Sequence, residues 1–125
     1  MQINRPDVVA EVAALHARYE AALVGNDVAT LEALFWDSPQ VVRFGATENL
    51  HGMDEIRAFR AARPSRGLDR TITRSVITTF GHDFATTSIE FTRDTDPRVG
   101  RQMQSWARLP EGWRIVAAHV SWMDG

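Results

Sequence analysis

The order of patterns along the chain predicts an α+β domain in which three helices pack on the concave face of a curved, mostly antiparallel sheet. Three helical segments come first, with one short strand between the second and the third. Four long strand patterns then follow, joined by turns of hairpin length. The chain has 125 residues, which suits one domain, residues 1–125, with one hydrophobic core.

The first helix is predicted to start at Asn4-Arg5-Pro6-Asp7, which offers a capping residue, a proline in the first turn and an acid near the positive end of the helix dipole. Its apolar positions form one stripe: Val8, Val12, Leu15, Tyr19, Ala22 and Leu23. Gly25-Asn26 ends this helix. Asp27 can cap a second, short helix from Val28 to about Trp36, which Ser38-Pro39 breaks.

A strand over Val41–Phe44 and a polar loop from Gly45 to His51 are predicted next, followed by a third helix from Gly52 to Arg63. The remaining strands cover roughly Leu68–Phe80, His82–Thr92, Arg101–Leu109 and Trp113–Trp122, with a longer loop at residues 94–97. A curved sheet crossed by helices leaves a cone-shaped cavity, and such cavities are mostly apolar with a few convergent polar groups. We therefore expect the site where polar residues interrupt inward-facing apolar stripes.

Composition excludes several classes of chemistry. The net charge is only −2, which favours neither nucleic acid nor a membrane as a partner. There is no cysteine, which excludes disulfides, thiol nucleophiles and cysteine-based metal sites and fits a cytoplasmic location. All 14 basic residues are arginine, so Schiff-base chemistry is excluded and an anion must be held by arginine, histidine or backbone N–H groups.

Neither a metal site nor a cofactor is predicted from the motifs. The chain has no HExxH, no histidine and carboxylate cluster at ligand spacing, and no GxGxxG, Walker or GxSxG pattern. No apolar run approaches the ~20 residues that a membrane-spanning helix needs.

Tyr19 and Arg43 are the polar residues hardest to place in an apolar core. Tyr19, the only tyrosine, lies in the centre of the apolar stripe of the first helix, so it is either a core residue bonded to a carbonyl or a phenol that points into the cavity. Arg43 lies in a strand, where alternation puts it opposite in facing to Val42 and Phe44. It turns either outward to water or inward to something negative, because a buried guanidinium needs a partner.

Five polar or aromatic positions interrupt the later strands. Alternation puts His119 and Ser121 on one face with Ile115 and Ala117, where they could orient a ligand, although no acid completes a triad. Gln104 and Trp106 share a face that is either cavity wall or interface. Glu90 is expected to pair with an arginine of a neighbouring strand. Helical spacing puts Arg60 and Arg63 near the Ile56 side, so one arginine of a basic run could edge the cavity mouth and add to an anion preference. Most of this run is expected to be solvated surface: Arg57, Arg60, Arg63, Arg66, Arg70 and Arg74.

Segments spread over nearly the whole chain resemble one protein family. They are NRPDVVAEV, RYEAALVGND, LFWDSP, VVRFGATENLHGMDEIRAFRAARP and GRQMQSWARLPEGWRIVAAHVS. Together they resemble the AtzH-like branch of the nuclear transport factor 2-like (SnoaL-like) superfamily, which includes proteins labelled oxalurate catabolism protein HpxZ. The resemblance implies the cystatin-like/SnoaL-like cone fold, a homodimer packed through the sheet and a partner amidase encoded nearby. It also implies a role in forming allophanate from 1,3-dicarboxyurea, with Tyr19 and Arg43 in the pocket.

We therefore predict a small hydrolase of nitrogen-compound catabolism, of amidase or decarboxylase type, acting on a carboxylated urea. Arg43, turned inward, would clamp a substrate carboxylate rather than a permanent acidic residue, and Tyr19 would give or take a proton. The predicted ligand-contacting residues are His119, Ser121, Asn49, Phe59 and Trp106.

Two alternatives stay open. One is a non-catalytic binder of an anionic metabolite or an accessory subunit of a partner amidase. The other is an isomerase, dehydratase or epoxide hydrolase, which needs a pocket carboxylate as base, and Glu90 and Asp37 are the candidates for it.

Overall fold

The computed structural model describes residues 1–64 and 68–124. Within them, three helices and six strands follow the predicted order. The helices are α1 (Pro6–Val24), α2 (Val28–Leu34) and α3 (Met53–Ala62). The strands are β1 (Val42–Phe44), β2 (Asn49–His51), β3 (Thr71–Phe80), β4 (Phe84–Arg93), β5 (Asp96–Leu109) and β6 (Gly112–Trp122).

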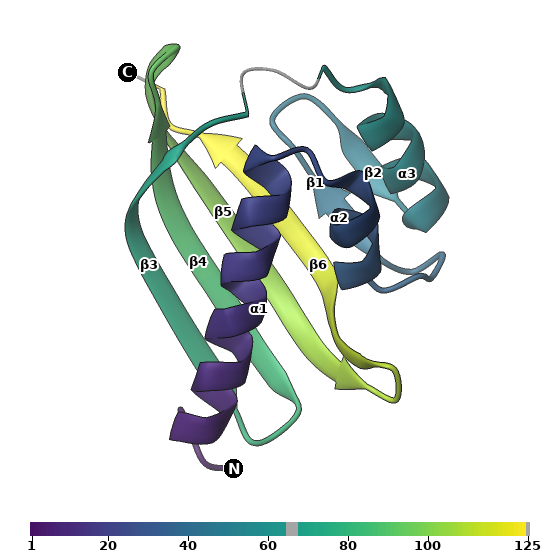
Figure 1. Cartoon of the computed structure of the whole chain (residues 1–125), viewed down its shortest axis with the longest axis vertical. Helices are drawn as coiled ribbons and strands as arrows, with labels where there is room; N and C mark the ends of the chain where they lie inside the picture. Colours follow the sequence, from purple (N-terminus) through teal and green to yellow (C-terminus); the bar gives the residue numbers. More distant parts are fainter. Residues whose placement is uncertain (65–67, 125) are drawn as a thin grey trace.

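All six strands form one curved, open sheet with the order β2-β1-β6-β5-β4-β3. All pairings of neighbouring strands are antiparallel except the one between β1 and β6, which is parallel. The helices lie on one face of this sheet: α1 crosses the long strands, and α2 and α3 cover the end formed by β1 and β2 (Figure 1). The predicted α+β architecture is therefore confirmed.

The core fills the space between the helices and the concave face of the sheet. Val12 of α1, Leu31 of α2, Ile56 of α3 and Trp106 of β5 are all completely buried there. The buried Trp106 indole donates to Thr87 Oγ1 at 3.2 Å, and this hydroxyl donates to Gln104 Oε1 at 3.1 Å. Trp106 and Gln104 thus share the concave face, where these hydrogen bonds satisfy polar groups that burial would otherwise leave unpaired.

Several predicted boundaries are wrong for identifiable reasons. The predicted loop from Gly45 to His51 contains β2, because a tight turn closes with the Gly45 amide donating to the Glu48 carbonyl at 2.9 Å. The predicted loop at residues 94–97 is a short turn, since β5 already begins at Asp96. Asn4 does not cap α1, because its Oδ1 accepts from the Thr79 amide at 2.9 Å.

The second helix ends at Leu34 rather than near Trp36. Phe35 is extended and forms a bridge with Ile115 of β6, and the Trp36 amide donates to the Ile115 carbonyl at 3.0 Å. Its predicted cap is confirmed, because Asp27 Oδ1 accepts from the Thr30 amide at 3.1 Å.

A bulge in β6 reverses the predicted facing of the end of the chain. Ser105 pairs with Ala117 and its neighbour Trp106 pairs with Ile115, so Val116 is the extra residue. Ile115 faces the core, whereas Ala117 lies on the convex face. Simple alternation therefore fails beyond Val116.

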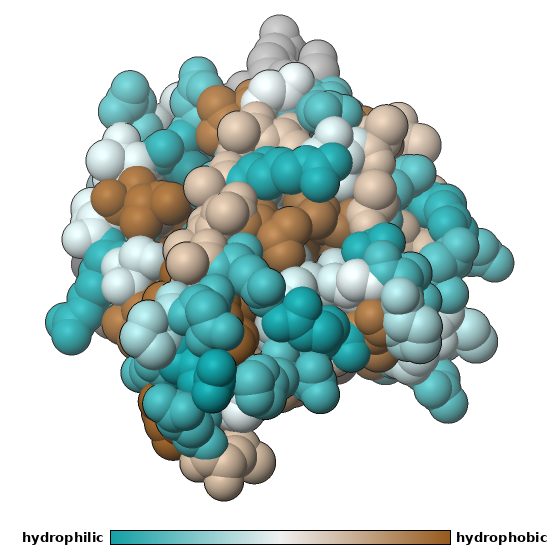
Figure 2. Space-filling view, turned by 60° about the horizontal axis from the view of Figure 1, so that its bottom comes forward, coloured by the Kyte–Doolittle hydropathy of each residue, from teal (hydrophilic) through white to brown (hydrophobic). Residues whose placement is uncertain are grey.

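The surface mixes polar and apolar groups. On the face shown in Figure 2, hydrophobic residues are exposed in separate patches among hydrophilic ones, as is usual for folded domains. Among residues 1–64 and 68–124, no helix combines the length and apolar character that crossing a bilayer requires.

Candidate anion-binding site

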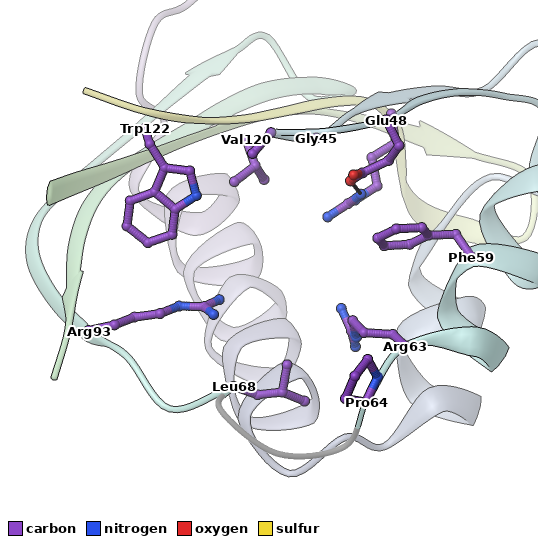
Figure 3. Close-up of a pocket in the computed structure, with 11 residues that line it drawn as sticks. Gly45, Glu48, Phe59, Arg63, Pro64, Leu68, Arg93, Val120 and Trp122 are labelled. Carbon is purple, nitrogen blue, oxygen red and sulfur yellow. Dashed lines mark hydrogen bonds and ion pairs between the residues drawn. The ribbon is translucent and has the colours of Figure 1, made fainter. Parts of the chain in front are cut away.

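A cavity of about 280 Å³ opens on the concave side, between the end of α3 and the sheet. Its charged lining residues are Arg43 of β1, Glu48 of the turn between β1 and β2, Arg63 at the end of α3 and Arg93 at the end of β4. Figure 3 shows the Arg63 and Arg93 side chains extending into this cavity from opposite sides. Three guanidinium groups and one carboxylate thus line a space of small-molecule size.

The rest of the wall is largely apolar. Phe59 of α3, Leu68, and Val120 and Trp122 of β6 surround the charged groups (Figure 3). Apolar walls lower the local dielectric, which strengthens the attraction of the guanidinium groups for an anion. A cavity of this kind suits a small anionic molecule.

Arg43 turns inward, as predicted, and is only 8% exposed. Its strand neighbours in register are the buried Leu50 and Ala118, so alternation gives it the concave face. The guanidinium lies over the Phe59 ring at 5.4 Å, a distance typical of a cation–π contact.

A permanent acidic partner of Arg43 is present, contrary to prediction. Arg43 Nη1 donates to Glu48 Oε1 at 3.1 Å, and Thr47 Oγ1 donates to the other Glu48 oxygen at 2.6 Å. Gly45 makes this possible, since a Cβ there would lie 1.6 Å from Glu48 Oε1. Arg43 Nε still has no hydrogen-bond partner, so the guanidinium retains a donor for a ligand.

Arg60 is a second inward guanidinium, and it is only 2% exposed. It stacks on the Phe35 ring at 4.7 Å, and its Nε and Nη1 have no hydrogen-bond partner. Burial lowers the pKa of Arg60, the Tyr19 hydroxyl partly raises it, and the positive charge of Arg43 lowers it again. An arginine stays charged at ordinary pH, so burying it without an acid costs several kcal/mol.

Tyr19 lies beside these arginines. It is 2% exposed, packs near Phe35 with ring centroids 6.3 Å apart, and interacts with both Arg60 and Arg63. Tyr19 does not line the cavity itself but lies with Arg60 behind its wall.

Positive charge also accumulates at the mouth of the cavity. Burial lowers the pKa of Arg63, with Tyr19 raising it and Arg43 and Arg93 lowering it further. Arg63 Nη2 donates to Asn26 Oδ1 over a long 3.4 Å. Burial likewise lowers the pKa of Arg93, Arg70 adds to that effect, and Asp96 opposes it.

The whole chain, residues 1–125, matches the model of the AtzH-like family. The chain belongs to the AtzH-like family. A search of curated proteins found no match. A protein of unknown function of the DUF3225 family from Pectobacterium atrosepticum is 61% identical, with a TM-score of 0.96, over 98% of this chain and 95% of that chain. A cystatin-like fold protein from Burkholderia xenovorans is 52% identical, with a TM-score of 0.96, over 100% of this chain and 98% of that chain.

A more distant likeness supports the fold alone. An NTF2-like superfamily protein from Salmonella enterica is 23% identical, with a TM-score of 0.77, over 96% of this chain and 94% of that chain. The cystatin-like, NTF2-like cone predicted from the sequence is therefore confirmed.

The structure brings together three of the residues predicted for the site. Arg43 and Phe59 line the cavity and contact each other, and Tyr19 lies behind its wall. Trp106 is also on the concave side, but it is completely buried in the core and donates to Thr87. Asn49 is exposed in β2 and does not line the cavity.

His119 and Ser121 lie on the other face of the sheet. In register, His119 is opposite Met103 and Phe44, and its ring contacts Phe44 at 5.8 Å between centroids. The bulge at Val116 explains why the predicted facing is wrong. Val120 and Trp122 occupy the cavity wall instead.

The two candidate carboxylate bases do not reach the cavity. Glu90 is exposed on the convex face, opposite Arg74 and Arg101 in register, which suits the predicted cross-strand pairing. Asp37 is exposed and pairs with Arg57 at 3.0 Å. Within residues 1–64 and 68–124 no cluster of histidine and carboxylate side chains could hold a metal ion.

The sequence prediction missed Glu48 and Arg93 as parts of the site, whereas Arg60 and Arg63 belong to the run from which it expected one arginine at the cavity mouth. The basic run was interpreted as mostly solvated, but Arg60 is buried, and Arg66 lies outside the described residues. A signal for Arg60 was present, because it follows the buried Ile56 by four residues and so shares its helix face.

Proposed function

We propose that the cavity binds a small carboxylated urea, such as 1,3-dicarboxyurea, and removes one carboxyl group from it. The observation that carries this proposal is the convergence of Arg43, Arg60 and Arg63 with a single lining carboxylate among the described residues. Guanidinium groups bind carboxylates in a planar, two-pronged geometry, which a flat dicarboxylated urea offers at both ends.

The proposed step releases carbon dioxide and leaves allophanate. As the bond between a nitrogen and its carboxyl carbon breaks, the nitrogen takes up one proton, so the dianion becomes a monoanion. Arg43 would hold the carboxylate that stays on the product, and the arginines would orient the urea and stabilise its charge. Tyr19 is the candidate proton donor, a role that requires the ligand to reach past Arg63 to the phenol.

The test is turnover of freshly prepared carboxylated ureas, followed as release of carbon dioxide and formation of allophanate. Tyr19→Phe and Arg43→Ala should each lower the rate by at least about 100-fold, a typical loss for an acid–base or electrostatic group. Arg57→Ala is the matched control, since Arg57 is on the same helix as Phe59 but outside this cavity. Full activity in either site variant, with the fold intact by circular dichroism, would contradict the mechanism.

A non-catalytic binder, or an accessory subunit of a partner amidase, is the second candidate function. It is favoured by the state of Glu48, the one carboxylate lining the cavity among the described residues, which is already bonded to Arg43 and Thr47. Binding of carboxylated ureas without turnover, together with co-purification of an amidase, would support this function over the enzymatic one.

We also propose a homodimer packed through the convex face of the sheet. Val76 and Met103 are 48% and 55% exposed there, and Met103 lies in register with His119. Large exposed apolar side chains on a sheet favour burial against another surface. Met103→Glu should yield monomers in light scattering, whereas Val24→Glu, at an exposed apolar residue of α1, should not.

A further inference from the structure

Arg60 is a buried cation for which the described part of the chain supplies no acid. Its Nε and Nη1 have no hydrogen-bond partner, and no ion pair with a carboxylate involves it among residues 1–64 and 68–124. Arg70, the other arginine stacked closely on a buried phenylalanine, has a two-pronged bond to Glu20. Arg60 therefore resembles a binding residue awaiting an anion more than a structural one.

The groups identified around Arg60 come from several elements, and none of them is a carboxylate. Phe35 follows α2, Tyr19 belongs to α1, Arg43 to β1, and Arg63 directly follows α3. The two neighbouring arginines repel Arg60 and each other. An anion placed among them would relieve both the desolvation and the repulsion.

Arg60 lies close in sequence to two residues that line the cavity. Phe59 of α3 and Arg63, which directly follows α3, both form part of the wall. Arg63 is held by one long hydrogen bond, 3.4 Å to Asn26 Oδ1, and its Nε has no partner. A movement of this side chain would therefore break little and would join Arg60 to the cavity.

We propose that Arg60 is a specificity-determining residue that receives a second anionic group of the ligand, the first being held at Arg43. This inference rests on the proposed function, because it assumes that the cavity binds an anion. It assigns to Arg60 the preference for dianions over monoanions. It also gives a reason for a charged side chain at this buried position of α3, where burial would favour an apolar residue.

The test compares malonate and acetate as probes by isothermal titration calorimetry and by thermal denaturation. The wild-type protein should bind malonate at least about tenfold more tightly than acetate, and Arg60→Met should reduce this ratio to about twofold. In the absence of ligand, Arg60→Met should melt at the same temperature as the wild type or higher, because it replaces an unpaired buried charge by an apolar side chain of similar length.

Three variants separate the possible results. Arg60→Lys, which keeps the charge, should restore part of the malonate preference, and Arg57→Met on the same helix should change nothing. A folded Arg60→Met with an unchanged malonate-to-acetate ratio, or one that melts well below the wild type without ligand, overturns the role of Arg60. Arg43→Ala tests the proposed function separately, since it should weaken both probes.

Discussion

Arg60 and Arg70 are both buried and stacked on phenylalanine rings, yet only Arg70 has a carboxylate partner. The Arg60 residue and the Arg70 side chain are each 2% exposed, and their guanidinium groups lie 4.7 and 4.4 Å from the centres of phenylalanine rings. Arg70 donates to both oxygens of Glu20, at 3.0 and 2.5 Å, and to Gln102 at 3.2 Å. Arg60 has no such acid among the described residues.

The difference distinguishes Arg70, whose charge is neutralised within the fold, from Arg60, whose charge we propose is neutralised by a ligand. Arg70 holds α1 to the sheet, because Glu20 lies on the helix and Gln102 on β5. Removing the Glu20 carboxylate should therefore lower the free energy of unfolding strongly, whereas removing the charge of Arg60 should not lower it.

Glu20→Gln tests the ion pair between Arg70 and Glu20 and has the largest expected effect on stability. It leaves Arg70 buried without an anion, so the free energy of unfolding should fall by about 3–5 kcal/mol, as for other buried pairs broken on one side. Urea denaturation followed by circular dichroism measures it. Glu32→Gln is the control, because Glu32 lies 4.0 Å from the partly exposed Arg57, and exposed pairs contribute about 0–1 kcal/mol. Equal losses for both variants would remove the distinction between Arg70 and Arg60.

Gly100→Ala tests the packing of the Phe91 ring on which Arg70 stacks. A Cβ at position 100 would lie 2.3 Å from the Phe91 ring, which is fully buried, so the ring or the strand must shift at a cost of about 1–3 kcal/mol. Gly45→Ala is the matched substitution in the cavity. There the conflict is with the flexible end of Glu48, so we expect a smaller loss of stability together with a broken Arg43–Glu48 pair. A larger loss at Gly45 than at Gly100 would contradict this.

The fold was predictable because helical stripes and long strands are local patterns. The stripe of the first helix assigned Tyr19 to its buried face, whereas alternation only put Arg43 opposite to Val42 and Phe44, and its inward turn was predicted from the family resemblance. His119 was assigned to the wrong face because one extra residue, Val116, shifts the alternation of every residue after it, and a bulge has no local signature here.

Pairings between distant side chains were harder to predict. Glu48 pairs with Arg43 because a tight turn returns the chain, and that turn was predicted as an open loop. The basic run that contains Arg60 was predicted to be mostly surface because arginines are mostly exposed in proteins. Only the packing of three elements around it reveals the missing acid.

His16, which interacts with Glu20 and Arg70, has the smallest expected effect on stability. It is 6% exposed, and burial lowers its pKa below the ordinary value of 6.5, with Glu20 partly raising it and Arg70 lowering it. The unfolded chain therefore binds a proton near pH 6.5 that the folded chain binds only at lower pH. Stability should consequently fall as the pH drops below about 6.5, by less than about 1.4 kcal/mol for each unit by which the pKa is lowered.

Replacing His16 by glutamine removes this titration. The loss in the free energy of unfolding between pH 7.5 and pH 5.5 should then be smaller than in the wild type, measured by urea denaturation at each pH. His51→Gln is the control, since His51 is exposed in β2 and should leave the pH dependence unchanged. If His16→Gln lost as much free energy of unfolding between pH 7.5 and pH 5.5 as the wild type, a group other than His16, Glu20 and Arg70 would control stability in acid. The difference between Arg60 and Arg70 would then be supported by the Glu20 variant alone.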